Sequence, residues 1–230
     1  MGVRFGVIGV NHGHIYRQVE LLRQCGAELV SFFAPEPELS AKFAKQVSGA
    51  KPARSEAEVL EDKSIQLITG AGIPCERGPL ALRAMKHGKD VLTDKPGFTT
   101  LDQLAETRRA QAETKRIYSI FYGRLDSPCT TQADELVKAG AIGRVVQVMG
   151  LGPHRSNLPD RPPWFFKRAQ YGGILCDIAS HDFEYFLHFA GTLEAEVVAS
   201  QVANYNHPEH PELEDFGDAV VRAKGKGWAT

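Results

Sequence analysis

Cysteine is scarce in this sequence, and the few cysteines are scattered. Four occur among 230 residues, and no two of them form a Cys-x-x-Cys pair. A disulfide framework or a zinc ribbon needs closely spaced cysteines. His207 and His210, followed by Glu212 and Glu214, offer metal-ligating side chains, but acidic Pro-containing loops are usually solvated connections. We therefore expect neither disulfides nor a bound metal.

Long apolar runs are also missing, and neither sign of charge predominates. The longest apolar segments, such as residues 5–10, have the length of a strand and fall far short of the roughly 20 residues that span a membrane. No small-residue cleavage site of a signal peptide follows the first ten residues. The formal net charge of −1 provides no basic surface for nucleic acid. We expect a cytoplasmic protein that binds neither nucleic acid nor membranes.

The first half of the chain alternates strand-like and helix-like segments. Strands are expected over residues 4–9, 28–33, 52–54, 65–69, 90–93 and 117–122. Helices are expected over residues 13–26, 37–47, 57–61, 75–87 and 100–114, the last with Thr99 or Thr100 as its N-cap. Such alternation predicts parallel crossover connections. The expected fold class is therefore α/β, with an N-terminal Rossmann-like, doubly wound parallel sheet.

After residue 123 the pattern becomes α+β, so we predict a dinucleotide-binding domain over 1–123 and a substrate or oligomerisation domain over 124–230. The expected elements are a helix at 130–139, a strand at 144–151, a loop at 152–171, a helix at 173–189 and strands at 194–203 and 218–224. They predict an open, mostly antiparallel sheet. A hairpin at 225–227 with a return strand at 228–230 would leave an unpaired edge, so we expect this domain to be incomplete; a partner chain that supplies the missing edge is the alternative.

The turn after the first strand partly matches the Gly-x-Gly-x-x-Gly fingerprint of dinucleotide-binding folds. The glycines let the backbone approach a pyrophosphate, and the following helix N-terminus offers free N–H groups. Asn11 and His14 stand in place of the second and third glycines, and Asn tolerates left-handed backbone, so Asn11 can still make the turn. The cofactor contacts expected from this turn are Gly9, Asn11, His12, Gly13 and His14. A plain strand-to-helix turn is the alternative.

The tip of the second strand lacks the acidic residue that would bind the adenosine ribose. Ala34 holds that place, and Glu36 lies just beyond it. An arginine to hold a 2′-phosphate is missing as well. The sequence therefore leaves the choice between NAD and NADP open.

Two later segments carry a more specific resemblance. Residues 90–97 read DVLTDKPG, and residues 172–184 read GGILCDIASHDFE. The first resembles the Glu-Lys-Pro motif, and the second the G-G-x-L-x-D-x-G-x-H-x-x-D helix, of the glucose–fructose oxidoreductase, inositol dehydrogenase and rhizopine-catabolism (Gfo/Idh/MocA) family. The resemblance covers essentially the whole chain. Asp94 replaces the Glu of the first motif, while Ala179 and Glu184 replace a Gly and an Asp of the second.

The resemblance implies an NAD(P)-dependent dehydrogenase that moves a hydride between nicotinamide and a secondary alcohol of a sugar, cyclitol or related polyhydroxy compound. It makes Lys95, Asp177 and His181 the catalytic residues, with Asp177 and His181 four apart on one helix face. A histidine titrates near neutral pH and suits the role of general base. Further cofactor contacts are expected from Ala34, Gly72, Pro74, Asp94, Lys95 and Pro96, the last often in a cis peptide bond in this family.

Substrate contacts are expected from the loop over residues 153–171 and from the catalytic helix. The expected residues are Tyr122, Arg124, His154, Arg155, Trp164, Asp177 and His181. Phe165 is expected to pin the loop to the sheet. The family resemblance also implies a homodimer or homotetramer.

Two other functions fit the same residues. The imperfect Gly-rich turn suits a non-catalytic relative that binds a nucleotide or sugar as a sensor or regulator. A family lyase or glycosidase that uses the cofactor only transiently is the second.

Overall fold

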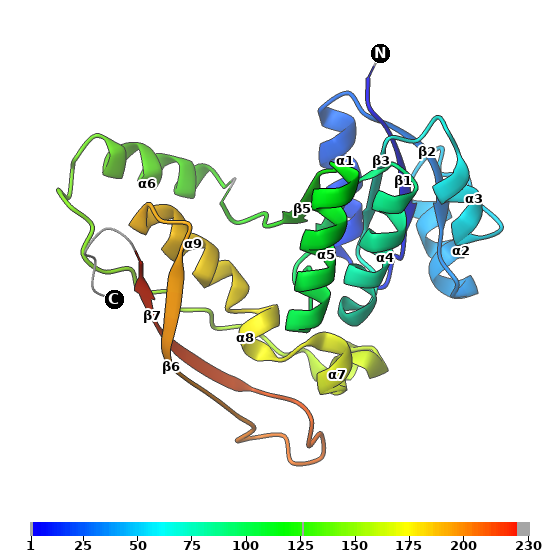
Figure 1. Ribbon diagram of the computed structural model, residues 1–230. Coiled ribbons are helices and arrows are strands. Elements are labelled where there is room, and N and C mark those ends of the chain that lie inside the picture. The colour runs from blue at the N-terminus through cyan, green and yellow to red at the C-terminus, as the bar shows by residue number, and fades with distance from the viewer. Residues whose placement is uncertain (1, 126, 225–230) are drawn as a thin grey trace. The chain divides into compact units, whose positions relative to one another are not determined.

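The computed structural model describes residues 2–125 and 127–224, and the chain divides into two compact units (Figure 1). Residues 1–121 form the N-terminal unit and residues 122–230 the C-terminal unit.

The N-terminal unit is built on a five-stranded parallel sheet with the order β2-β1-β3-β4-β5. Its strands are β1 (Arg4–Ile8), β2 (Glu28–Phe33), β3 (Leu67–Gly70), β4 (Asp90–Asp94) and β5 (Tyr118–Phe121). Its helices are α1 (His14–Gln24), α2 (Pro37–Gln46), α3 (Glu56–Glu61), α4 (Pro74–Lys86) and α5 (Leu101–Thr114). The strand order departs from β1 in both directions, as in doubly wound folds. The predicted fold class is thereby confirmed.

Alternation along β1 explains why helices cover both faces of this sheet. Phe5 and Val7 are fully buried in one hydrophobic cluster, together with Ile15 of α1 and Phe43 of α2. Ile8 belongs to a second cluster, which includes residues of α3, α4 and α5. Successive side chains of a strand point to opposite faces, so one short apolar strand supports both layers.

Helix ends in this unit follow their sequence signals. Thr100 caps α5, as expected, because its side chain accepts a hydrogen bond from the backbone N–H of Gln103. Gly88, just past α4, has a φ of +76°. The strand expected at residues 52–54 is reduced to an isolated bridge between Phe32 and Pro52.

The C-terminal unit combines short helices with a two-stranded antiparallel sheet. Its helices are α6 (Pro128–Lys138), α7 (Arg168–Tyr171), α8 (Ile174–Asp177) and α9 (Ser180–Ala190), with 3₁₀ turns η1 (Leu158–Asp160) and η2 (Pro163–Phe166). Its strands are β6 (Ala195–Ala203) and β7 (Phe216–Ala223). The hairpin and return strand expected at residues 225–230 lie outside the described residues.

Two expectations for this unit were wrong. Residues 144–151 form no strand, and Met149 and Leu151 in this segment are 80% and 86% exposed. Their apolar pattern alone suggested a strand, but the sheet that the structure describes offers them no partner. The helix expected at residues 173–189 is broken at Ile178 and Ala179 into α8 and α9.

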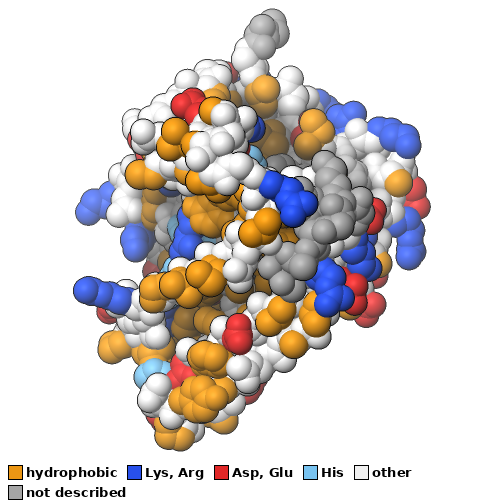
Figure 2. Space-filling model, turned by 90° about the vertical axis from the view of Figure 1, so that its left-hand side faces the viewer, with side chains coloured by type: hydrophobic (Ala, Val, Ile, Leu, Met, Phe, Trp, Pro, Cys, Tyr) orange, Lys and Arg blue, Asp and Glu red, His pale blue; other side chains and the backbone are white. Residues whose placement is uncertain are grey.

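Apolar side chains also remain exposed on the two-stranded sheet. Val197 of β6 and Val220 of β7 are 58% and 43% exposed. Figure 2 shows hydrophobic side chains gathered in several patches on the face turned to the viewer. Among the described residues, no helix combines the length and the apolar character needed to cross a membrane.

Candidate active site

The turn after β1 is shaped by two glycines in contact. Gly9 has a φ of +80°, and a Cβ on it would lie 2.9 Å from the Cα of Gly72. Both residues follow the carboxyl ends of adjacent parallel strands, where open α/β sheets bind their ligands. The left-handed residue of this turn is Gly9, so the expectation that Asn11 would supply that conformation was wrong.

Asn11 instead uses its side chain to reach the end of β2. Its Nδ2 donates a hydrogen bond of 2.7 Å to Oε1 of Glu36. The other oxygen, Oε2 of Glu36, is buried and has no hydrogen-bond partner among the described residues. The residue in place of the second glycine thus fixes an acidic side chain beside the turn.

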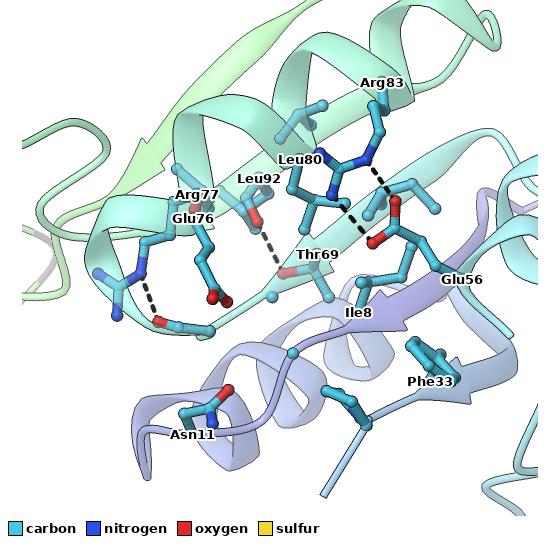
Figure 3. A pocket seen from close by; sticks show the side chains of 17 residues that line it. Ile8, Asn11, Phe33, Glu56, Thr69, Glu76, Arg77, Leu80, Arg83 and Leu92 are labelled. Carbon is cyan, nitrogen blue, oxygen red and sulfur yellow. Dashed lines mark hydrogen bonds and ion pairs between the residues drawn. The ribbon is translucent and has the colours of Figure 1, made fainter. Parts of the chain in front are cut away.

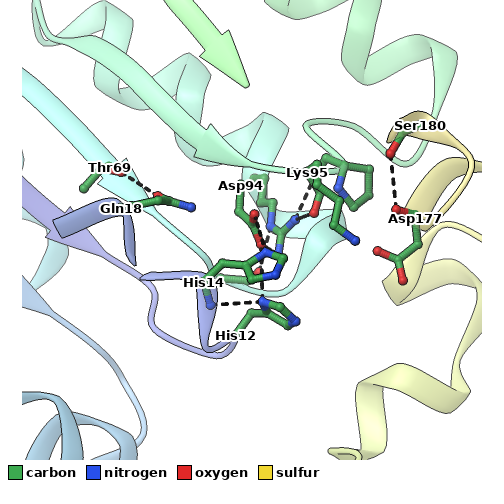
Figure 4. A network of polar contacts seen from close by, with 11 residues as sticks. His12, His14, Gln18, Thr69, Asp94, Lys95, Asp177 and Ser180 are labelled. Carbon is green, nitrogen blue, oxygen red and sulfur yellow. Dashed lines mark hydrogen bonds and ion pairs between the residues drawn. The ribbon is translucent and has the colours of Figure 1, made fainter. Parts of the chain in front are cut away.

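His12, His14 and Asp94 come together at the carboxyl ends of β1 and β4 (Figure 4). Nδ1 of His14 lies 2.9 Å from Oδ1 of Asp94, and Nδ1 of His12 accepts a 3.2 Å hydrogen bond from the backbone N–H of His14. The two imidazole rings meet edge to face, with centroids 4.1 Å apart. Both Nδ1 atoms are thus already engaged, and these hydrogen bonds account for the cluster.

Arg77 of α4 joins this cluster to the segment that follows β4. Its Nη2 lies 3.3 Å from Oδ2 of Asp94, and both side chains are almost fully buried. Its Nε donates to the carbonyl of Gly72 at 2.8 Å, and its Nη1 donates to the carbonyls of Lys95 and Pro96. The Lys95–Pro96 peptide bond is cis. One guanidinium therefore fixes three backbone carbonyls and one carboxylate.

Burial and charge oppose each other at this cluster. Burial favours the neutral form of Asp94, but the hydrogen bond from His14 and the charge of Arg77 outweigh it, so the pKa of Asp94 is lowered. Burial, with the nearby His14, lowers the pKa of His12 to about 4. At neutral pH, His12 is therefore uncharged and Asp94 is ionised.

A cavity opens beside the same turn (Figure 3). Ile8, Phe33 and Leu80 line it with apolar surface, while Asn11 and Glu76 contribute polar groups. Burial raises the pKa of Glu76, and the neighbouring Glu36 carboxylate raises it further. An apolar cavity with a few fixed polar groups is typical of a small-molecule site.

The remaining predicted cofactor residues in this unit take backbone roles. Ala34 is 8% exposed and packs in the core, consistent with its inability to bind a ribose hydroxyl. Gly13 is the N-cap of α1, with open space around its Cα, and Pro74 is the first residue of α4.

In the C-terminal unit, His181 lies in the first turn of α9 and is 7% exposed. The ring of Tyr122 meets the ring of His181 edge to face, with centroids 5.8 Å apart. The structure thus brings together one predicted catalytic residue and one predicted substrate residue.

Asp177 and His181 do not share a continuous helix. Asp177 is the last residue of α8, and its backbone carbonyl accepts a 3.2 Å hydrogen bond from Oγ of Ser180. The expectation of two side chains on one helix face was wrong, because the helix is interrupted between them. The sequence carries no Pro or Gly at the break, so nothing in the pattern indicated it.

The loop expected to contact substrate is held by its own aromatic and charged side chains. Phe165 packs on the buried Tyr171 at 5.7 Å and carries the Arg161 guanidinium 4.3 Å from its ring centroid. Among the ring contacts of the described residues, Trp164 makes one, an edge-to-face contact with Phe165 in which the ring centroids lie 6.1 Å apart. These contacts of Phe165 lie within residues 161–171, and its expected contact with the sheet stays a prediction.

Two of the remaining predicted substrate residues meet each other. Nη2 of Arg124 lies 3.4 Å from Nε2 of His154, and the backbone carbonyl of Arg124 accepts a hydrogen bond from the Tyr185 hydroxyl. Arg155 is exposed.

The acidic loop before β7 is occupied by ion pairs. Glu212 pairs with Lys167 at 2.8 Å, and Glu214 pairs with Arg168 at 2.7 Å. Glu214 also accepts a 2.7 Å hydrogen bond from the N–H of Ile174, at the start of α8. These carboxylates position the segment that carries the second family motif.

Sequence reasoning missed Arg77 and the role of Glu36. Arg77 lies in a helix that looked like an ordinary crossover element, and only the tertiary fold turns it towards β4. Glu36 was visible next to Ala34, but its tie to Asn11 depends on contact between two turns that are 25 residues apart.

A parallel doubly wound sheet with a left-handed glycine after β1 defines a Rossmann-type dinucleotide-binding unit. Residues 3–122 match the family model described as oxidoreductase family, NAD-binding Rossmann fold. Residues 130–230 match the model of the GFO/IDH/MocA C-terminal domain. The chain belongs to the Gfo/Idh/MocA oxidoreductase family, which confirms the resemblance carried by the two motifs.

Relatives of known name agree with this membership. The chain is 25% identical over 217 residues to scyllo-inositol 2-dehydrogenase (NAD(+)) of Bacillus subtilis strain 168, covering 94% of this chain and 61% of that protein. It is 24% identical over 202 residues to 1,5-anhydro-D-fructose reductase of Ensifer adhaerens, covering 85% and 59%. The chain therefore spans about three fifths of the length of these two relatives.

A solved structure is more similar. It is a crystal structure from Erwinia carotovora atroseptica SCRI1043, provisionally named an oxidoreductase, with 47% identity and a TM-score of 0.94. The match covers 96% of this chain and 67% of that one.

Proposed function

We propose that the protein is an NAD(P)-dependent dehydrogenase that oxidises or reduces one secondary alcohol position of a sugar, cyclitol or related polyhydroxy compound. The observation that carries the proposal is the Gly9–Gly72 contact at the carboxyl ends of β1 and β3, in a chain that belongs to this oxidoreductase family. The named relatives act on a cyclitol and an anhydrosugar, which supports the substrate class.

The residues present fit a dinucleotide. A side chain at Gly9 would fill the narrow approach to the turn. Oε2 of Glu36 is buried and has no hydrogen-bond partner among the described residues, so a ligand could donate to it. Gly9, Asn11 and Gly13 would hold the dinucleotide at the N-terminus of α1, where backbone N–H groups and the helix dipole favour phosphate. When bound, the nicotinamide accepts or donates the hydride.

Three side chains are proposed to handle the substrate oxygen. His181 takes the hydroxyl proton during oxidation and returns it during reduction. Lys95 provides positive charge that stabilises the developing alkoxide. Asp177 accepts a hydrogen bond from the substrate and limits its orientation. Tyr122, whose ring contacts His181, restricts that ring's rotation.

The place of action and the assembly are part of the same proposal. Free, scattered cysteines support a reducing compartment such as the cytoplasm. The apolar side chains exposed on β6 and β7, among them Val197 and Val220, support a homodimer or homotetramer.

A turnover assay tests the proposal. The intact protein is mixed with NAD⁺ or NADP⁺ and a panel of cyclitols, pentoses, hexoses and anhydrosugars, and absorbance at the reduced nicotinamide band is followed. We expect turnover with at least one compound, and a loss of 100-fold or more in kcat in Lys95→Ala and His181→Ala, on the order found for general acid–base groups.

The exposed Lys86 and His87 provide matched controls in Lys86→Ala and His87→Ala, which should keep wild-type turnover. Full turnover in both Lys95→Ala and His181→Ala would refute the assigned roles. Product formed without net change in nicotinamide would instead identify a lyase or glycosidase.

A further inference from the structure

The unpaired oxygen of Glu36 indicates a missing hydrogen-bond donor. Glu36 is the N-cap residue of α2, three positions after the end of β2. Its Oε1 is held by Asn11, whereas Oε2 is buried without a partner among the described residues. A buried carboxylate oxygen without a donor is costly, and native structures rarely keep one unless a ligand or water completes it.

The position of this carboxylate suits the ribose of an adenosine. Asn11 and Pro35 both line the cavity of Figure 3. Asn11 is hydrogen-bonded to Glu36, and Pro35 directly precedes Glu36 in the chain. The cavity's apolar walls, Ile8 and Phe33 among them, suit a flat heterocycle. Glu36 does not line the cavity itself, but its bonds to Asn11 and Pro35 place it next to the lining, where the sugar that joins the heterocycle to its phosphates would lie.

The charges around the cavity oppose a further phosphate. Glu76 lines it and is close enough to Glu36 for the two carboxylates to repel. The two arginines of the lining, Arg77 and Arg83, already serve other acceptors. Arg83 donates to Glu56 at 3.0 Å, and Arg77 is committed to Asp94 and to backbone carbonyls. Among the lining residues, no arginine is directed at the Glu36 carboxylate.

We propose that Glu36, fixed by Asn11, accepts the hydroxyl groups of the adenosine ribose and makes the site selective for NAD(H) over NADP(H). The inference rests on the proposed function and names its cofactor. A ribose 2′-hydroxyl donates a hydrogen bond to a carboxylate, whereas a 2′-phosphate has only acceptors and brings negative charge. Asn11 is a positioning residue, because it acts through Glu36.

Calorimetric titration of the intact protein with NADH and NADPH tests the inference. We expect NADH to bind on the order of 100-fold more tightly, because like charges across a binding site cost several kcal/mol. Glu36→Gln keeps the shape of the side chain and removes its charge. It should weaken NADH binding about tenfold, strengthen or preserve NADPH binding, and reduce the ratio of the two affinities to about tenfold or less.

Two further variants separate positioning from general structure. Asn11→Ala should reduce the ratio of the affinity for NADH to the affinity for NADPH. A general loss of stability would not change this ratio. Glu38→Gln removes an exposed carboxylate from the same helix, two residues away, and should leave the ratio unchanged. Melting curves by circular dichroism verify that each variant is folded.

A competition experiment needs no variant. Against bound NADH, 5′-AMP should compete and 2′,5′-ADP should compete at least tenfold less well. Equal affinity of the wild type for NADH and NADPH, or an unchanged ratio in Glu36→Gln, would overturn the inference and leave the proposed function standing. Binding of neither dinucleotide would overturn the proposed function itself, and this inference with it.

Discussion

Replacing Arg77 with methionine should destabilise the N-terminal unit more than any exposed charge substitution. Arg77 and Asp94 are 3% and 1% exposed at their side chains and lie 3.3 Å apart. Removing one partner of a buried ion pair typically costs about 3–5 kcal/mol, because the other charge stays buried without compensation. Methionine keeps most of the volume, so the loss reflects charge and hydrogen bonds and not an empty cavity.

The pH dependence of this loss identifies its cause. In the wild type the pKa of Asp94 is lowered, so its ionised form contributes stability above its ordinary pKa, and this contribution is lost as pH falls through the lowered value. Without Arg77, the ionised form of Asp94 is buried without its compensating charge, and protonation of Asp94 removes that cost. The destabilisation by Arg77→Met should therefore be largest at neutral pH and shrink as pH falls towards 4.

Hydrogen exchange followed by mass spectrometry measures this locally. Peptides from α4 and β4 should exchange faster by the factor that corresponds to the lost free energy, about 100-fold or more. Arg54→Met is the control, because Arg54 is 92% exposed and pairs only with Glu58 among the salt bridges of the described residues. A loss below about 1 kcal/mol in Arg77→Met, or a loss that grows on acidification, would refute the reasoning.

Three other changes have expected outcomes. Because the pKa of His12 is lowered to about 4, the folded protein should lose up to about 3 kcal/mol as pH falls from 6.5 to 4, and urea titrations at several pH values should show a shallower loss in His12→Asn. Gly9→Ala should lower the free energy of unfolding by about 2 kcal/mol or more and weaken NADH binding, because it adds a clash with Gly72 to the strain of a left-handed backbone. Gly26→Ala is the control, because Gly26 has a φ of +81° but open space around it, and should cost only about 1 kcal/mol. Equal costs for the two variants in urea titrations would contradict the Gly9–Gly72 contact. Glu214→Gln should destabilise the C-terminal unit by about 1–2 kcal/mol in urea titrations read by tryptophan fluorescence, because its charge-assisted bond to Arg168 is lost, and no change would show that this anchor is dispensable.

The N-terminal fold could be predicted because local and global signals agree there. Residues 5–10 form a strand-length apolar run, and the glycine and cap signals at Gly88 and Thr100 mark the helix ends. Parallel strands alternate with amphipathic helices, so each segment's period indicates its own type. The strand predicted at residues 52–54 was too long, since the structure has only an isolated bridge at Pro52. A single backbone pairing is too short to produce a recognisable sequence pattern.

The C-terminal unit was harder because its apolar residues are not buried by local partners. The run over residues 144–151 has the composition of a strand. Among the described residues, however, the sheet of the C-terminal unit contains only β6 and β7. The break between Asp177 and His181 has no Pro or Gly to announce it. Strand pairing and helix breaks of this kind depend on tertiary context, which a single sequence does not contain.

The candidate site divides in the same way. Residues His12, His14 and Asp94 of the two motifs meet, although β3 lies between β1 and β4 in the sheet. Arg77, which holds Asp94, and Glu36, which holds Asn11, act through contacts between distant segments and carry no local pattern. The motifs thus predicted candidate residues, and the structure shows which side chains hold some of them in place.

Calorimetric titration of the intact protein with NAD⁺, NADH, NADP⁺ and NADPH tests the central claim most directly. Any nucleotide carried through purification is first detected by denaturing a sample and examining the released material. The account predicts one binding event per chain for NADH, with a Kd in the low micromolar range, on the order of −7 to −8 kcal/mol. Failure of all four dinucleotides to bind up to millimolar concentration, with none released on denaturation, would contradict it.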